Sequence, residues 1–482
     1  MINFLFSFEH ILNDKILGVP RRWLARNSHY WLSPLIIIGV LLLSVALGYE
    51  ASSRHLTMIL LVLPAVGVLL LFIRWPPIGL IAIIGSIIIP FDGPSKVNAT
   101  MAVVGLLLGL WLMNMMVLQR EVKLVPSKTI LPLLIFISVA ILAFGVGQLP
   151  WYTFAQPAPM GAQLGGLAIF VLSAGAFLLV PHQIRELRWL KWMTWLFLAL
   201  GALFISGRLI PGLGRFTGRL FIVSAIGSLF WTWLVALAFS QAVFNRDLHP
   251  GWRLVLDGLV LATFYEGYFI SEDWKSGWVP PLFTIVTMVG LRFWRISLLL
   301  SPLGIIPLSR LISYGIAADE YSYSTRIDAW TIVLEITKVN PLLGLGPSNY
   351  RWYTPLFPIR GWAVYFNSHS QYVDLIAQTG LLGLACFVWF FGAVGWLGWQ
   401  LLERVPAGFA RAYVYGALGG LVGTLVAAAL GDWVLPFFYN ITLGGFRASV
   451  LGWLFLGGLV ALEQIYTNHT HINVKRLTEP GK

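Results

Sequence analysis

His369 is the histidine in this sequence best placed for acid–base chemistry. It lies in the run NSHSQYVDLIAQTGLLGL, where Ser368-x-x-Gln371 has the spacing of a capping box, so we expect His369 in the first turn of a helix. A helix amino terminus disfavours imidazolium, because both are positive, and would keep the ring neutral as a general base requires. On spacing alone, a structural hydrogen bond is the more common role of such a histidine.

A group of arginines marks a second place where chemistry could occur. Arg208, Arg215 and Arg219 lie in the run GRLIPGLGRFTGRL. Guanidinium groups bind phosphate and carboxylate oxygens in pairs of hydrogen bonds, so this run predicts a site for a diphosphate or carboxylate ligand. Contact with lipid headgroups, or snorkelling at helix ends, is the alternative. Lys275 in the run EDWKSG is either a further ligand cation or a charge that neutralises the acidic pair before it.

Other kinds of chemistry have little support in the sequence. It contains no HExxH, no CxxC pair and no histidine-rich cluster, so we expect no metal. No GxxxxGK[ST] phosphate loop occurs, so we expect no nucleotide and no other cofactor. The net charge of +12 does not indicate nucleic acid, because the basic residues are scattered through short segments between apolar runs. The energy for any reaction must then come from the substrate or from a gradient.

Long apolar segments must position these residues. Of the 482 residues, 58% are hydrophobic and 11% are charged, whereas soluble domains are about 25% charged. Only helices satisfy the backbone across the hydrocarbon of a membrane, so the sequence predicts an all-α, polytopic membrane protein with about 12 to 14 transmembrane helices. Pro280 and Pro281 predict a kink or a broken helix in one of them. The candidate spans are 34–49, 57–73, 76–90, 99–117, 129–147, 162–180, 190–206, 220–242, 254–270, 277–291, 296–308, 380–401, 412–430 and 448–463.

These spans divide the chain into four parts. Most Lys and Arg residues fall in the segments that lie inside when both termini are cytoplasmic, as the positive-inside rule requires. Within the large outer loop, Thr325-x-x-Asp328 predicts the start of an amphipathic helix that Asn340-Pro341 closes. The parts are a cytoplasmic or interfacial segment without a cleavable signal (1–33), transmembrane helices with a basic outer loop at 207–219 (34–308), one large extracytoplasmic loop with short helices (309–379), and the last transmembrane helices with a cytoplasmic tail (380–482).

Two motifs of the large loop resemble those of a known family. The run RIDAWTIVLEITKVNPLLGLGPSNY at 326–350 has an arginine and a tryptophan on a helix, followed by an NPxxGxGxxxY turn. The run at 367–384 has a histidine that opens a helix ending in TGxxGL. This combination resembles the superfamily of O-antigen ligases and lipid-linked O-antigen polymerases, which also includes proteins named as bicarbonate transporters. Ser370 and Gln378 stand where family members usually have asparagine and glutamate.

The resemblance implies a GT-C-like glycosyltransferase of the bacterial cytoplasmic (inner) membrane, a cell-envelope enzyme of polysaccharide or lipopolysaccharide biosynthesis. Such an enzyme needs no metal, and at the outer face it transfers glycan from undecaprenyl diphosphate to a hydroxyl of an acceptor lipid or glycan. It implies that His369 assists the attack by this hydroxyl. The cations that would hold the carrier diphosphate are Arg215, Arg219, Lys275 and Arg326. Arg326 has a structural alternative, which is an ion pair with Asp328 or Glu320.

The resemblance leaves ligase and polymerase open, because a lipid-anchored sugar and the end of a growing chain present the same hydroxyl chemistry. An anion (bicarbonate) or glycan transporter is the alternative from another class. It would be expected to have charged residues near mid-membrane or discontinuous helices in matching halves, and the sequence has few such residues and no twofold pattern. An inert assembly scaffold would leave the outer arginines unexplained.

Overall fold

The structure is a computed structural model that describes residues 66–93, 96–221, 227–271, 274–295 and 320–478, with side chains described as far as residue 467. Residues 1–78 and 79–482 form two compact units. The contacts that build the candidate site all lie within the second unit. Throughout the described ranges the chain forms helices, turns and loops without a β-strand, and its bridges are isolated ones such as Asp92 with Asn98. The predicted all-α class is therefore confirmed for these residues.

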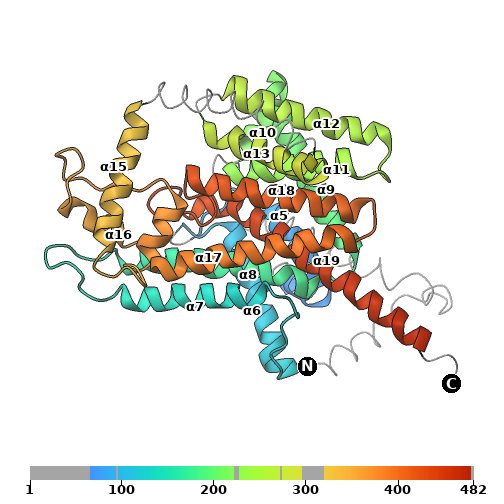
Figure 1. The fold of residues 1–482 in the computed structure, drawn as a ribbon, viewed down its shortest axis with the longest axis horizontal. Coiled ribbons are helices and arrows are strands. Elements are labelled where there is room, and N and C mark those ends of the chain that lie inside the picture. The colour runs from blue at the N-terminus through green and yellow to red at the C-terminus, as the bar shows by residue number, and fades with distance from the viewer. Residues whose placement is uncertain (1–65, 94–95, 222–226, 272–273, 296–319, 479–482) are drawn as a thin grey trace, which may run out of the picture. The chain divides into compact units, whose positions relative to one another are not determined.

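The helices have the following bounds, with labels as in Figure 1: α5 Pro76–Ser86, α6 Ala99–Met113 with its π-helical continuation Asn114–Gln119, α7 Ile130–Val146, α8 Met160–Gln183, α9 Leu187–Leu209, α10 Pro211–Leu220, α11 Ser228–Phe244, α12 Pro250–Tyr265 with the π-helical Glu266–Ile270, α13 Lys275–Arg292, α15 Glu320–Thr337, α16 Tyr350–Tyr353 with the 3-10 turn Thr354–Leu356, α17 Gln371–Arg404, α18 Phe409–Leu430, and α19 Phe446–Thr478 after the 3-10 turn Leu443–Gly445.

Six helices among the described residues are long and apolar enough to cross a membrane, which is the signature of a multi-pass membrane protein. Three further apolar helices, α5, α7 and α11, are shorter. The predicted total of about 12 to 14 spans stays a prediction, because the candidates 34–49 and 296–308 and most of 57–73 lie outside the described residues. The six candidate spans are Ala99–Gln119, Met160–Gln183, Leu187–Leu209, Gln371–Arg404, Phe409–Leu430 and Leu443–Thr467.

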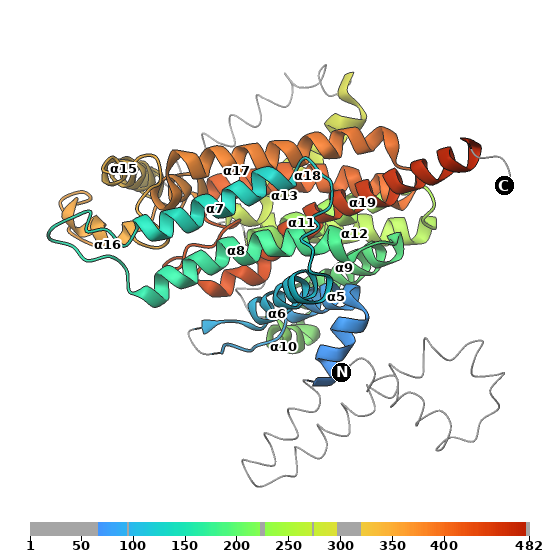
Figure 2. The ribbon, with the colours of Figure 1, turned by 90° about the horizontal axis from the view of Figure 1, so that it is seen from below.

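Helix α19 is the buried centre of the helix packing. Its apolar window is entirely buried, and it packs against α8, α11, α17 and α18. Figures 1 and 2 show α7, α8, α17, α18 and α19 running beside one another. Small residues allow the close approach, since Gly457 of α19 lies against the carbonyl of Phe177 and Gly458 lies against the ring of Tyr413.

Two predictions about the middle of the chain are wrong in detail. Residues 207–219 do not form a loop, because α9 continues through Arg208 and α10 begins at Pro211, a residue preorganised for the first helical position. Helix α10 packs on α9 where Thr217 lies against Gly207. Of the two outcomes predicted at Pro280 and Pro281, the broken helix is wrong, because α13 runs through both residues, and the kink stays a prediction.

Helix α15 crosses the amino-terminal end of α17, as both views show (Figures 1 and 2). A separate hydrophobic core holds this part together, with Val333 and Ile336 of α15, Tyr350 of α16 and Ala377 of α17 among its fully buried members. The helix begins at Glu320 rather than near Thr325, so the predicted start is wrong. Its end at Thr337, just before Asn340-Pro341, agrees with the predicted closure. Residues 309–319 of the predicted large loop lie outside the described residues.

Candidate functional site

The glycine-rich turn after α15 docks on a break in α17. Gly380 has φ 69° and ψ −173°, a conformation that is essentially restricted to glycine, and it interrupts the helical dihedral angles of α17. Backbone hydrogen bonds join the two segments, from Leu345 N–H to Ala377 O (2.9 Å) and from Leu381 N–H to Pro341 O (2.8 Å). A Cβ on Gly344 would lie 2.7 Å from the backbone nitrogen of Gly380. The two sequence motifs are therefore two halves of one backbone joint.

Asn349 connects this joint by hydrogen bonds to the segment between α7 and α8. Its side-chain amide donates to the carbonyl of Gly147 (3.1 Å), and its oxygen accepts from the backbone N–H of Ala158 (2.9 Å). The side chain of Gln378 accepts from the N–H of Ser348 (3.1 Å), a role that a glutamate could also fill. The turn is thereby tied to the segment between α7 and α8 as well as to α17.

The backbone just before His369 is held from two sides. The indole N–H of Trp330, on α15, donates to the carbonyl of Ser368 over 2.7 Å. On the other side, Ser368 Oγ donates to Asp374 Oδ1 (2.7 Å), and the same carboxylate oxygen accepts from Tyr350 Oη (2.6 Å). Side chains from three helices, α15, α16 and α17, thus converge on Ser368, and His369 is the next residue after it.

His369 itself lies before α17 rather than in its first turn. Its φ is +52°, in the left-handed region, and the helix begins at Gln371 with Ser370 as the capping residue. The predicted capping box does not form, because Ser368 Oγ accepts from the N–H of Ser370 (3.1 Å) instead of Gln371, and the side chain of Gln371 accepts from Leu435 N–H over 2.8 Å. The left-handed backbone turns the imidazole out of the helix axis and into a cavity.

A pair of polar residues from the segment after α18 meets the imidazole. His369 Nδ1 lies 3.3 Å from the amide nitrogen of Asn440, which also donates to Asp432 Oδ1 over 2.5 Å. The backbone N–H of Phe437 donates to the other Asp432 oxygen (2.6 Å). Partial burial and the nearby charge of Arg326 lower the pKa of His369, which favours the neutral ring. Burial raises the pKa of Asp432 from 3.8 to about 6, against the hydrogen bonds from Phe437 and Asn440 that lower it.

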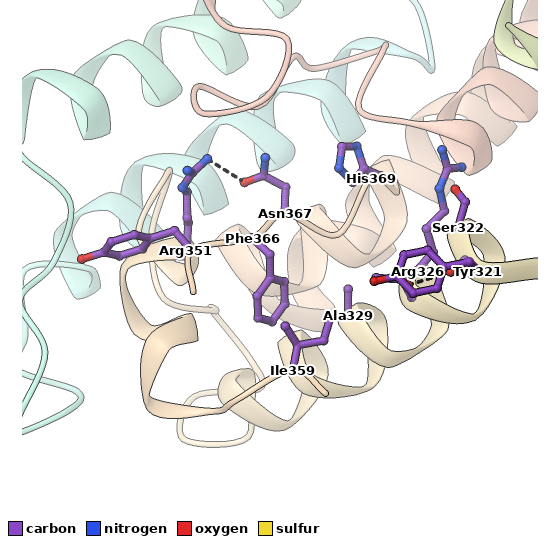
Figure 3. Close-up of a pocket in the computed structure, with 11 residues that line it drawn as sticks. Tyr321, Ser322, Arg326, Ala329, Arg351, Ile359, Phe366, Asn367 and His369 are labelled. Carbon is purple, nitrogen blue, oxygen red and sulfur yellow. Dashed lines mark hydrogen bonds between the residues drawn. The ribbon is translucent and has the colours of Figure 1, made fainter. Parts of the chain in front are cut away.

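The cavity at His369 has a volume of about 500 Å³. Its basic lining groups are Arg326, Arg351 and His369, and no carboxylate is among the described residues that line it. In Figure 3 the side chains of Arg351, Asn367 and His369 point to the same side of the loop that carries the last two. The full lining is Tyr321, Ser322, Thr325, Arg326, Ala329, Arg351, Ile359, Tyr365, Phe366, Asn367 and His369. Such a lining suits an anion.

Neither lining arginine is neutralised by an acid within the described part of the chain. Arg351 donates to the carbonyl of Tyr439 (2.9 Å) and to Asn367 Oδ1 (3.3 Å), which are neutral acceptors. The alternative for Arg326 is wrong, because it forms an ion pair neither with Glu320 nor with Asp328, which instead accepts from Arg360 Nε over 2.7 Å. The positive charge of both guanidinium groups is therefore left for a ligand.

The other predicted cations do not line this cavity. Arg215 and Arg219 are exposed on α10, and Lys275 is the first residue of α13. Arg208, from the same run, forms an ion pair of 2.5 Å with the fully buried Glu266. Of the five predicted site residues, the structure brings His369 and Arg326 together and leaves the remaining three on other elements.

Sequence reasoning missed Arg351 and Asn440. Arg351 directly follows the NPxxGxGxxxY motif, so its place beside a tightly constrained turn is a signal that could have been used. Asn440 offers no such signal, because it meets His369 across a sequence separation of 71 residues. No group of His, Cys, Asp and Glu side chains of metal-site size occurs in the part of the chain that the structure describes.

No protein-family model matches this chain, and no curated protein matches it either.

Proposed function

We propose that this protein is a metal-independent membrane glycosyltransferase of the O-antigen ligase or polymerase type. In this proposal it transfers glycan from undecaprenyl diphosphate to a hydroxyl of an acceptor lipid or glycan, at the outer face of the bacterial cytoplasmic membrane. The observation that carries the proposal is the cavity that Arg326, Arg351 and His369 share, with no carboxylate among its described lining residues. The resemblance of the motifs at 326–350 and 367–384 to that superfamily supports it further.

The arrangement suits a reaction whose leaving group is a diphosphate. The acceptor oxygen would form a bond to the anomeric carbon of the donor sugar while the bond from that carbon to the diphosphate oxygen breaks. Negative charge then collects on the departing diphosphate, where the guanidinium groups of Arg326 and Arg351 could stabilise it. Cations fixed before the reaction contribute most, because they need not reorganise as the charge develops.

His369 would take the proton of the acceptor hydroxyl. Only the neutral ring can do this, and the lowered pKa of His369 keeps it neutral at physiological pH. Because the Asn440 amide nitrogen donates to Asp432 and faces Nδ1, Nδ1 is the acceptor of the neutral ring and the ring proton is on Nε2. Nδ1 would then take the proton of the hydroxyl, exchanging its contact with Asn440 for one with the acceptor. After transfer, the imidazolium lies near Arg326, so the proton would be readily released to solvent or to the diphosphate.

A transporter for an anion or a glycan is the second candidate, because unpaired arginines beside an open cavity also suit an anion path. The two functions differ in whether a covalent bond is broken. A transporter would move the anion across a sealed vesicle and leave the lipid-linked glycan intact.

The test is reconstitution of the protein in vesicles with an undecaprenyl-diphosphate glycan and a set of acceptors, without metal or nucleotide. We expect acceptor-dependent release of the lipid carrier, lost in His369→Ala and Arg326→Ala. Lys338→Ala is the matched control, since Lys338 is an exposed cation just after the same helix and pairs with Glu335. Full release in both site variants, or none with any acceptor in the unsubstituted protein, would contradict the transferase. Product length separates ligase from polymerase.

A further inference from the structure

Three aromatic side chains form a wall beside the cations of the cavity. Tyr365 lines the cavity and is 52% exposed. Its ring centre lies 5.6 Å from that of Trp352, and Trp352 donates its indole N–H to Tyr439 Oη over 2.8 Å. The rings of Trp352 and Tyr439 are 6.3 Å apart. We call Trp352, Tyr365 and Tyr439 the aromatic wall.

Arg351 connects the aromatic wall to the anion-binding part of the cavity. Its guanidinium lies 5.2 Å from the ring centre of Tyr439 and 5.9 Å from that of Tyr365. The same group donates to the carbonyl of Tyr439, which fixes its position. Because one cation touches both rings and also lines the cavity, a ligand whose anion binds Arg351 places its neighbouring atoms against Tyr365.

The aromatic wall is arranged differently from an aromatic group that only fills a core. In the neighbouring hydrophobic core, Tyr350 and Tyr353 are almost fully buried. Tyr365, by contrast, packs against Trp352 and Arg351, lines the cavity and leaves half of its surface exposed. A ring immobilised in this way presents a rigid apolar face with a hydroxyl at its tip, and Asn367 adds an amide close by.

A pyranose sugar matches this combination of groups. One face of the sugar ring carries C–H groups that pack on the negative face of an aromatic ring, and its hydroxyls need polar partners at the edge. We propose that the aromatic wall binds the sugar attached directly to the diphosphate, with Tyr365 as the stacking residue. This inference rests on the proposed function, because it assigns the position of the donor sugar within the same cavity. Tyr365 is then a specificity residue, whereas Arg326 and Arg351 recognise the charge.

Binding measurements on the whole protein in nanodiscs test the inference without requiring transfer. The probes are a short water-soluble prenyl diphosphate and the same molecule carrying glucose, galactose or N-acetylglucosamine. We expect at least one sugar to bind about threefold to tenfold more tightly than the prenyl diphosphate alone, which is the range of one aromatic packing contact. Tyr365→Leu should abolish this difference and leave the affinity for the prenyl diphosphate unchanged, while Tyr365→Phe should retain most of it.

Trp362→Leu is the matched control, because Trp362 is 72% exposed on the same loop and does not line the cavity. If Trp362 and Tyr365 served only as interfacial membrane anchors, both leucine variants would alter membrane insertion and neither would alter sugar discrimination. The inference is overturned if no sugar adds affinity, or if Tyr365→Leu weakens the prenyl diphosphate as much as its glycosylated forms. If the protein discriminates between sugars but releases no carrier in the reconstitution assay, the proposed transferase function is contradicted while the aromatic wall stands as a sugar-binding site.

Discussion

Replacing Gly380 by alanine should dismantle the site without touching any residue that lines the cavity. At φ 69° and ψ −173°, this position is in a region that is essentially restricted to glycine. A Cβ there would overlap the carbonyl of Leu342 in the turn that docks on α17. The helix must then either adopt regular dihedral angles or move away from the turn, and both changes displace the segment that leads to His369.

The size of the effect follows from these contacts. The backbone strain of a non-glycine residue in this region costs about 1 to 3 kcal/mol. The clash also breaks the two hydrogen bonds nearest to it, from Leu381 N–H to Pro341 O and from Leu382 N–H to Leu342 O. Each contributes about 1 kcal/mol to the free energy of unfolding. We therefore expect Gly380→Ala to destabilise the native state by about 3 to 5 kcal/mol.

The control is Gly392→Ala in the same helix. A Cβ at Gly392 meets no atom within 4 Å, so alanine should be neutral or should stabilise the helix by about 0.5 to 1 kcal/mol. The assay is the temperature at which half of the detergent-solubilised protein aggregates, together with the rate of carrier release in vesicles. Gly380→Ala should lower both quantities while Gly392→Ala lowers neither. Equal melting and full release in the two variants would refute the assignment of the turn and α17 to one joint.

Three further predictions concern the groups around the histidine. Because burial and Arg326 lower the pKa of His369, release should fall off only as the pH drops below the ordinary value of 6.5, and Arg326→Gln should move that midpoint upward in a pH profile at saturating donor. Burial raises the pKa of Asp432 to about 6, so between about pH 4 and 6 the native state holds a proton on this carboxyl that the unfolded state has lost. The melting temperature should therefore decrease as the pH rises through this range. Asp432→Asn should remove this decrease, and an unchanged decrease would contradict the assignment to Asp432. Trp330→Phe removes the donor to Ser368 and should lower kcat with KM nearly unchanged, whereas a purely stabilising role for Trp330 would lower the amount of folded protein and leave kcat per folded molecule intact.

Predictions that depend on local composition were confirmed, whereas predictions that depend on tertiary partners were not. Apolar runs predicted helices such as α8, α9 and α18 within a few residues, because the solvation of a helix in hydrocarbon depends on local composition. The capping box predicted at Ser368 was wrong, because the Ser368 hydroxyl accepts from Ser370 N–H and the Gln371 side chain accepts from Leu435 N–H. Local spacing identifies groups that are able to cap a helix, but tertiary partners can take those groups first.

The basic run 207–219 illustrates the same limit. Its arginines are close in sequence, yet Arg208 at the end of α9 pairs with Glu266. Arg215 and Arg219 are exposed on α10, which does not contribute to the cavity. Closeness in sequence did not predict which cations share a ligand, because a helix boundary within the run turns their side chains to different partners.

The sequence by itself determined that the chain is helical and apolar enough to span a membrane, and its two motifs marked Arg326, Trp330 and His369 as residues to examine. Only the tertiary structure decided that Arg326, Arg351 and His369 line one cavity and that Asn440 meets the imidazole. Composition and spacing are local properties that act along one segment of chain. The shared cavity depends instead on the glycine joint between the turn and α17, whose hydrogen bonds form only when the two segments have already packed together.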